Sequence, residues 1–168
     1  MRKVFTAIEV PIDILSEFEQ TSLVIQNQPH ITLHFIGGIS EEKLELLNQR
    51  LNSIPASSFE IEISGVGKFF NNSKSFLWAK VIPNIDLLNL HKEIGLSLKH
   101  FYLPIEEREY CPHITIAVTN DDELADNFLE SHMNVQFKFK VNQFSTFQSE
   151  FVNGKPHYKR VYSYALQK

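Results

Sequence analysis

The residues Pro-His-Ile-Thr occur twice in this chain, once around His30 and once around His113. Each copy opens an alternating stretch, which predicts a β-strand whose side chains point to opposite faces in turn. On the first strand His30 shares a face with Thr32, and on the second strand His113 shares a face with Thr115. The chain therefore presents an imidazole beside a hydroxyl twice, in the same local setting.

An imidazole exchanges protons near neutral pH, because its reference pKa is about 6.5. One neutral and one protonated histidine on opposite sides of a substrate supply a base and an acid. In-line displacement at phosphorus needs both, and threonine hydroxyls can donate to the phosphoryl oxygens as negative charge builds up. We expect no metal and no cofactor. The predicted catalytic residues are His30, His113, Thr32 and Thr115, and the threonines also bind substrate; the residues alone do not distinguish acid from base.

The same alternation predicts where the neighbouring side chains lie. It places His34 on the face of His30, at the rim of the site, where we expect it to bind substrate phosphate. It places Phe35 on the opposite face, in the core. On the second strand it places Ala117 on the face of the site and Val118 in the core.

Two other functions fit the same residues. The histidine pair could form a non-catalytic pocket for terminal or cyclic phosphates, in which case tight binding would occur without turnover. Alternatively, His30, His34 and His113 could hold a metal ion, although no acidic residue lies within the motifs to support such ligands. Cys111 precedes His113 by two residues, but a lone thiol is more often inert than nucleophilic.

The elements that carry these motifs also repeat. Residues 5–15 resemble residues 77–88, since each segment reads as a strand, a proline and the start of a helix. Residues 59–69 resemble residues 137–147, with aromatic or branched side chains at matching positions. Further helices are expected from Pro11 to about Ile25, from Ser40 to Ile54, up to about Phe101, and from Asp121 to about Glu130.

Repeated blocks in the same order predict a duplicated architecture. We expect a single domain over residues 1–168, with halves at roughly 3–70 and 76–147 and a final strand at about 157–166, after the Asn153-Gly154 turn. The predicted fold is α+β, bilobal and pseudo-two-fold, with two mostly antiparallel sheets flanking a central cleft and helices on the outside. Such symmetry would set the two motifs opposite one another across the cleft.

Composition limits the class of protein. The chain has 168 residues, 43% of them hydrophobic and 21% charged, which suits one globular domain. No apolar run approaches the roughly 18–20 residues that span a bilayer, and the first residues read as a strand rather than a signal peptide. A single cysteine fits a reducing compartment, so we expect a cytoplasmic protein. The net charge of −4 disfavours a broad nonspecific nucleic-acid surface, and we expect a monomer.

The paired motifs His30-Ile-Thr32-Leu and His113-Ile-Thr115-Ile resemble the signature of the 2H phosphoesterase superfamily. Together with FTAIEVP, PHITLHFIG, FEIEISGVGKF, LWAKV and PHITIA, they resemble its RNA 2′,3′-cyclic phosphodiesterase branch, also called 2′-5′ RNA ligase-like. The resemblance covers nearly the whole chain. Members of the branch often carry Arg or Lys where His34 stands, and a basic residue where Ala117-Val118 stands.

The resemblance implies metal-independent opening of a 2′,3′-cyclic phosphate to a phosphomonoester, typically the 2′-phosphate, on a bilobal α+β fold. It also implies some ATP-independent reverse joining of RNA ends. It assigns His30 as the proton donor and His113 as the proton acceptor. The substrate would be RNA ends or a small cyclic nucleotide; 2′-5′ oligonucleotides and ADP-ribose cyclic phosphate, used elsewhere in the superfamily, stay alternatives.

Overall fold

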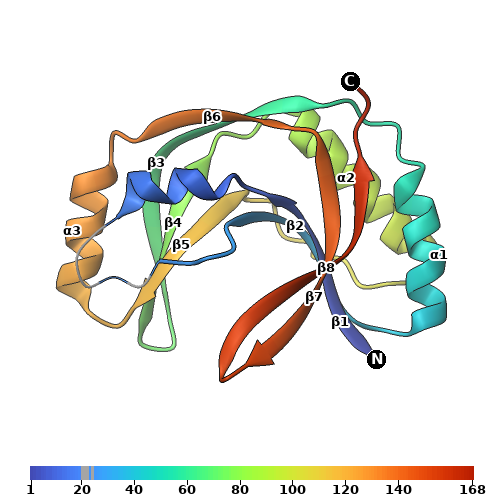
Figure 1. Ribbon diagram of the computed structural model, residues 1–168, viewed down its shortest axis with the longest axis horizontal. Coiled ribbons are helices and arrows are strands. Elements are labelled where there is room, and N and C mark those ends of the chain that lie inside the picture. The colour runs from blue at the N-terminus through green and yellow to red at the C-terminus, as the bar shows by residue number, and fades with distance from the viewer. Residues whose placement is uncertain (20–22, 24) are drawn as a thin grey trace.

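The computed structural model describes residues 1–19, 23 and 25–168, which form an α+β fold as predicted (Figure 1). The elements in chain order are β1 (Arg2–Glu9), the 3₁₀ helix η1 (Ile12–Phe18), β2 (His30–Ile39), α1 (Glu41–Asn52), β3 (Phe59–Asn71), β4 (Lys74–Val81), α2 (Ile85–His100), β5 (His113–Thr119), α3 (Asp122–His132), β6 (Gln136–Val141), β7 (Gln143–Val152) and β8 (Lys155–Ala165).

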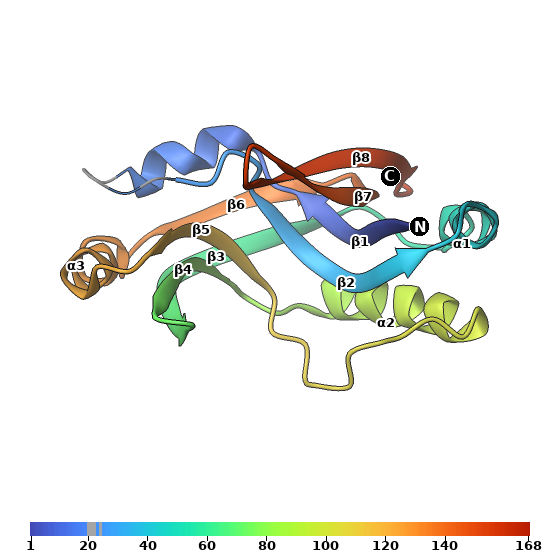
Figure 2. The same cartoon turned by 90° about the horizontal axis from the view of Figure 1, so that it is seen from below.

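The strands form one curled antiparallel sheet in the order β6-β3-β4-β5-β2-β1-β7-β8. We expected two sheets, and the sheet indeed contains two four-stranded units that meet at β5 and β2. These units are joined because Ile31 of β2 pairs with Ile114 of β5, the one residue pair in register between these strands in the described chain. Figure 2 shows β2 and β5 converging at this junction, between the two halves of the molecule.

The strand register relates residues that the sequence repeat aligns with one another. Ile31 and Ile114 occupy the same position in the two motifs and pair directly. Ile61 of β3 pairs with Phe139 of β6, and these residues are also matched by the repeat. Two copies related by an approximate two-fold axis produce such pairing of equivalent residues. The division into halves at 3–70 and 76–147 stays a prediction that this register supports.

The helices lie outside the sheet, with α3 at one end of the molecule and α1 beside α2 at the other (Figure 1). Ser40 caps α1 by accepting a hydrogen bond from the backbone of Lys43, as expected for an N-cap residue. The helix predicted from Pro11 to about Ile25 is wrong at its far end. It is a 3₁₀ helix that ends at Phe18, and Ile25 instead pairs with Ala117; residues 20–22 and 24 lie outside the described residues.

None of the helices in the described ranges is long and apolar enough to cross a membrane.

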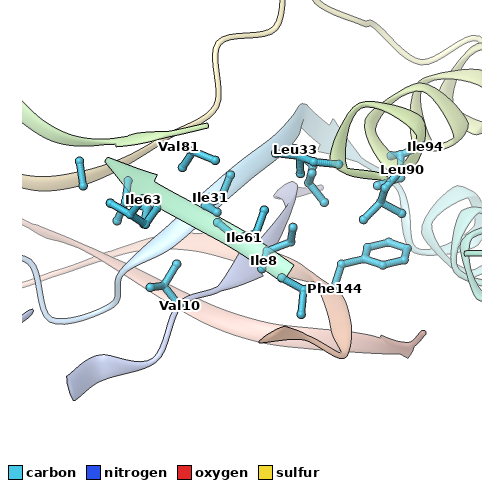
Figure 3. Close-up of a cluster of buried hydrophobic side chains, with 14 of the residues drawn as sticks. Ile8, Val10, Ile31, Leu33, Ile61, Ile63, Val81, Leu90, Ile94 and Phe144 are labelled. Carbon is cyan, nitrogen blue, oxygen red and sulfur yellow. The ribbon is translucent and has the colours of Figure 1, made fainter. Parts of the chain in front are cut away.

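The hydrophobic core lies between the inner face of the sheet and the helices. Figure 3 shows Leu33 of β2 on the side of Leu90 and Ile94 of α2, with Ile31 farther from the helix, and all four side chains are almost fully buried. Burying apolar area of this kind contributes roughly 25 cal/mol per Å², which makes the core the main source of stability. The opposite face of β2 and β5 carries the polar residues of the two motifs.

A β-bulge interrupts the alternation of each motif strand. In β2 the pairing with β1 skips Leu33, and in β5 the pairing with β4 skips Ile116, the fourth residue of each motif. Because one extra residue reverses which face the following side chains occupy, the predicted faces of the next residues are wrong. His34 and Ala117 are buried, whereas Phe35 is 69% exposed and Val118 is half-buried.

This reversal predicts the stability of two variants. Leu33→Ala should lower the free energy of unfolding by about 2–5 kcal/mol, because it leaves a cavity in the core. Phe35→Ala should cost about 1 kcal/mol or less, since the ring is largely exposed. Urea denaturation of both variants measures the difference, and a larger loss for Phe35→Ala would restore strict alternation and refute the bulge.

Candidate active site

The two motif histidines are the first residues of their strands. His30 opens β2 and His113 opens β5, so each lies one residue before the Ile31–Ile114 pair that joins the two halves. Both rings are half-buried. Because β2 and β5 are antiparallel about that pair, the two histidines flank it from opposite strands. The fold therefore brings together two side chains that are 83 positions apart in the chain.

Each histidine is held by the same backbone contact. Nδ1 of His30 lies 2.8 Å from the carbonyl oxygen of Gln28, and Nδ1 of His113 lies 2.9 Å from that of Cys111. Since a carbonyl only accepts, Nδ1 carries the proton in both rings, and in the neutral ring Nε2 bears the lone pair. Within the described residues, no protein group hydrogen-bonds either Nε2 atom. Both Nε2 atoms remain available to exchange a proton.

The surroundings of His30 are aromatic and tightly packed. Its ring centroid lies 5.4 Å from that of Phe5 and 5.0 Å from that of Tyr158, which meets it edge-on. Burial is the main cause of a lowered pKa of His30; the bond to Gln28 opposes this shift and the charge of His113 adds to it. The resting ring is thus neutral over a wider pH range than a free imidazole.

Gln28 anchors the segment that holds His30. Its side-chain amide donates to the carbonyl oxygen of Tyr158 at 2.8 Å, and its side-chain oxygen accepts from the backbone N–H of Tyr158 at 3.0 Å. This two-way contact fastens the chain just before β2 to β8. The carbonyl that sets the tautomer of His30 is consequently fixed in place.

Two cavities flank the histidine pair. The smaller cavity, of about 240 Å³, is lined by His30, Phe5 and Tyr158. Glu9 and Arg160 also line it and form a salt bridge with each other, with Nε of Arg160 2.9 Å from Oε1 of Glu9. The larger cavity, of about 600 Å³, contains the predicted residues Thr32, His34 and His113 together with Phe35, Phe69, Trp78, His91, Glu106, Arg108, Tyr110 and Cys111. Each histidine therefore faces its own hollow.

The two predicted threonines lie on the face of the histidines. Thr32 is half-buried and lines the larger cavity. Thr115 is also half-buried and pairs in register with Trp78, but it lines neither cavity among the described residues. Neither hydroxyl has a hydrogen-bond partner in the part of the chain that the structure describes.

His34 does not share the face of His30, which corrects the prediction. The bulge at Leu33 turns its ring onto α2, where it is 6% exposed and its Nε2 lies 2.8 Å from the carbonyl oxygen of His91. The ring stacks on that of His91 at 4.0 Å, and His91 stacks on Tyr110 at 3.8 Å. Its Nε2 is occupied by that carbonyl, but His34 still lines the larger cavity, so its contact with substrate phosphate stays a prediction.

Comparison with known proteins agrees with the sequence resemblance. The model of the 2′-5′ RNA ligase superfamily matches residues 5–150 of the chain. The chain belongs to the 2′-5′ RNA ligase superfamily. An RNA 2′,3′-cyclic phosphodiesterase of Methanocaldococcus jannaschii is 30% identical over 94% of this chain and 96% of its own length. One of Archaeoglobus fulgidus is 29% identical over 87% of this chain and 86% of its own.

Solved structures share the fold of this chain. The crystal structure of Escherichia coli LigT complexed with 3′-AMP superposes with a TM-score of 0.78, at 20% identity, over 99% of both chains. A protein of Thermus thermophilus, TT0787, superposes with a TM-score of 0.74 at 22% identity, over 99% of this chain and 98% of its own. The α+β fold predicted from the motif resemblance is therefore confirmed.

The metal-site alternative depended on His30 and His34 sharing a face, and the bulge separates them. In the described part of this superfamily member, no group of three or more His, Cys, Asp or Glu side chains is placed to hold a metal ion.

The sequence interpretation missed several residues around the histidines. Tyr110 donates from its hydroxyl to the carbonyl oxygen of Thr32 at 2.8 Å, and so ties the loop before β5 to β2. His91 and Gln28 were not selected because no motif includes them. Trp78 could have been found, since the alternation of Ser75 to Ile82 places it on the polar face of its strand.

The ring stack predicts a pH dependence of stability. Burial, and then the charge of His34, lower the pKa of His91 to about 4 from its ordinary value of 6.5. As the pH falls from 6.5 towards 4, His91 becomes protonated in the unfolded chain but stays neutral in the folded protein. The free energy of unfolding therefore decreases. His91→Phe keeps a ring in the stack and removes this titration.

We therefore expect the His91→Phe variant to lose less stability than the wild type between pH 6.5 and 4. Some dependence should remain, because burial also lowers the pKa of His34. Urea denaturation at several pH values measures the slope, with the exposed His100→Phe as the matched control. Equal slopes for the wild type and His91→Phe would contradict the assignment.

Proposed function

We propose that the protein hydrolyses a nucleoside or RNA 2′,3′-cyclic phosphate to a phosphomonoester, the 2′-phosphate, without a metal ion. The observation that carries this proposal is the pair His30 and His113, each with Nδ1 bonded to a backbone carbonyl and Nε2 left unpartnered among the described residues. The curated relatives named RNA 2′,3′-cyclic phosphodiesterase support the substrate class.

In this mechanism the phosphorus lies between the two Nε2 atoms. A water molecule attacks phosphorus opposite the 3′-oxygen, and the neutral histidine accepts the water proton as the new P–O bond forms. The protonated histidine donates to the 3′-oxygen as the P–O3′ bond breaks, which leaves the phosphate on the 2′-oxygen. The hydroxyls of Thr32 and Thr115 stabilise the charge that builds on the non-bridging oxygens.

The family assignment makes His30 the proton donor and His113 the acceptor. Burial opposes this role in the free protein, because it lowers the pKa of His30. An anionic phosphate bound beside the ring would raise that pKa again, since an opposite charge favours the protonated form. Substrate binding would then charge His30 at the moment when an acid is needed.

Joining of RNA ends, the second activity that the resemblance implies, would use the same groups. A 5′-hydroxyl of a second RNA end would replace water as the nucleophile and lose its proton to His113, while His30 protonates the departing 3′-oxygen. A 2′-5′ linkage forms, and each histidine keeps the role it has in hydrolysis. The separate cavity beside each histidine supports such joining of two RNA ends. A second RNA end needs a cavity of its own, whereas a water molecule does not. The substrate would be RNA ends or a small cyclic nucleotide.

Replacing either histidine tests the proposal. His30→Ala and His113→Ala should each lower the rate of hydrolysis of a nucleoside 2′,3′-cyclic phosphate by roughly 10²- to 10⁴-fold, because each removes one proton-transfer group. His100→Ala, the same change on the exposed end of α2, is the matched control. Full activity of either single variant would refute the mechanism, and tight binding without turnover by the wild type would indicate the non-catalytic alternative.

The Gln28 anchor predicts a second kinetic effect. Gln28→Met removes both hydrogen bonds to Tyr158 while keeping the length of the side chain. The carbonyl that accepts from Nδ1 of His30 would then move, and kcat should fall roughly 10- to 100-fold with little change in KM.

The pH profile separates this positioning role from general damage to the fold. A weaker carbonyl contact stabilises the protonated ring less, so the limb of the profile that reports His30 should shift to lower pH. Gln26→Met is the control, since Gln26 bonds to β5 through its backbone N–H. An unshifted profile would show that Gln28 does not act through His30.

A further inference from the structure

Gly67 and Trp78 form a directly opposed pair on β3 and β4. A Cβ atom added to Gly67 would lie 2.3 Å from Cη2 and Cζ2 of the indole, far inside any real contact distance. The indole therefore lies across the Gly67 backbone, in space that only glycine leaves free. One face of the ring is supported by the strand, which holds the side chain in a fixed orientation.

The rest of the indole belongs to the candidate active site. Trp78 is half-buried, lines the larger cavity, and lies with its ring centroid 6.1 Å from that of His113. Phe69, which is 46% exposed, lines the same cavity and stacks on Phe76 at 4.9 Å with the planes only 4° apart. The β3–β4 hairpin thus brings flat aromatic surface to the edge of the reacting pair.

The side of His30 carries aromatic rings that are held in a different way. Trp78 pairs with Thr115 in register, and the residue that pairs with Thr32 is Ala7. Ala7 is fully buried with Phe5 and Phe147, and Tyr158 packs against that cluster. The two sides therefore differ in how their aromatic rings are held, although their motifs are alike. Tyr158 lines the smaller cavity and meets His30 edge-on, whereas the indole of Trp78 lies across Gly67.

We propose that the indole of Trp78, held flat on Gly67, is the stacking surface for the nucleobase of the nucleotide that carries the phosphate, which places the nucleoside on the His113 side. This inference rests on the proposed function. A planar ring that is already oriented loses little conformational freedom when a base stacks on it, and such stacking strengthens binding of any base by roughly tenfold or more. The platform selects nucleotides over other cyclic phosphate esters, without selecting one base.

The chain contains a single tryptophan, so fluorescence excited selectively from tryptophan, and not from the tyrosines, reports Trp78 alone. Titration with adenosine 2′-phosphate should quench this fluorescence, because a stacked base contacts the indole directly. Ribose 5-phosphate, which carries a phosphate and no base, should cause little quenching at the same concentrations. Equal quenching by both compounds, or by neither, overturns the proposal.

Kinetics provide an independent measurement. For the wild type, KM of adenosine 2′,3′-cyclic phosphate should be roughly tenfold or more below that of ribose 2′,3′-cyclic phosphate. Trp78→Leu and Gly67→Ala should bring the two values together, the first by removing the ring and the second by displacing it. Trp78→Phe should retain part of the preference, because it keeps an aromatic face.

Gly38→Ala is the matched control for Gly67→Ala, since its added Cβ would meet only the side chain of Met1, at 3.4 Å. It should keep the wild-type ratio of the two KM values. Thermal melts identify variants that fail to fold. If Gly67→Ala is one of them, Trp78→Phe is used in its place, and its ratio of the two KM values should lie between those of the wild type and Trp78→Leu.

If the wild type hydrolyses both esters with equal KM, the stacking surface is refuted and the proposed function stands. If it hydrolyses neither, the proposed function fails, and the fluorescence titration alone decides the stacking surface.

Discussion

The backbone pairing of Ile31 with Ile114 is the constraint on which the arrangement of the site depends. It joins the two four-stranded units into one sheet, and it lies one residue from both histidines. Because both side chains are fully buried, the junction is also held by the core. The chemistry that we propose would therefore take place where the two halves of the fold meet, and any shift of β2 against β5 would change the distance between the two rings.

The protein orients its two histidines through the backbone rather than through carboxylates. In each motif the carbonyl two residues upstream accepts a hydrogen bond from Nδ1, and Nε2 has no hydrogen-bond partner among the described residues. The upstream segments are secured differently, by the side chain of Gln28 on one side and by the hydroxyl of Tyr110 on the other. Two nearly identical motifs thus acquire different surroundings, as an acid and a base require.

Simple alternation predicted the faces of the four residues of each motif correctly and failed at the residues that follow, from His34 and Ala117 onwards. The bulges at Leu33 and Ile116 lie in the pairing of β2 with β1 and of β5 with β4. No local sequence pattern predicts them. They bury His34 and expose Phe35, so the larger cavity is lined by a histidine whose Nε2 is already bonded and by an exposed aromatic ring. The helix predicted to reach Ile25 failed for a related reason, because that residue pairs with Ala117 of β5 instead.

The sequence by itself determined the superfamily, the α+β class and the two histidine-threonine pairs, because the duplicated motif and its alternating flanks are local patterns with strong structural meaning. Only the tertiary structure decided that the two sheets are joined, that His34 turns onto α2, and that Gln28, Tyr110 and Trp78 surround the site. These features arise from contacts between residues far apart in the chain. Such contacts depend on strand register and packing, and neither is encoded in the spacing of any single segment.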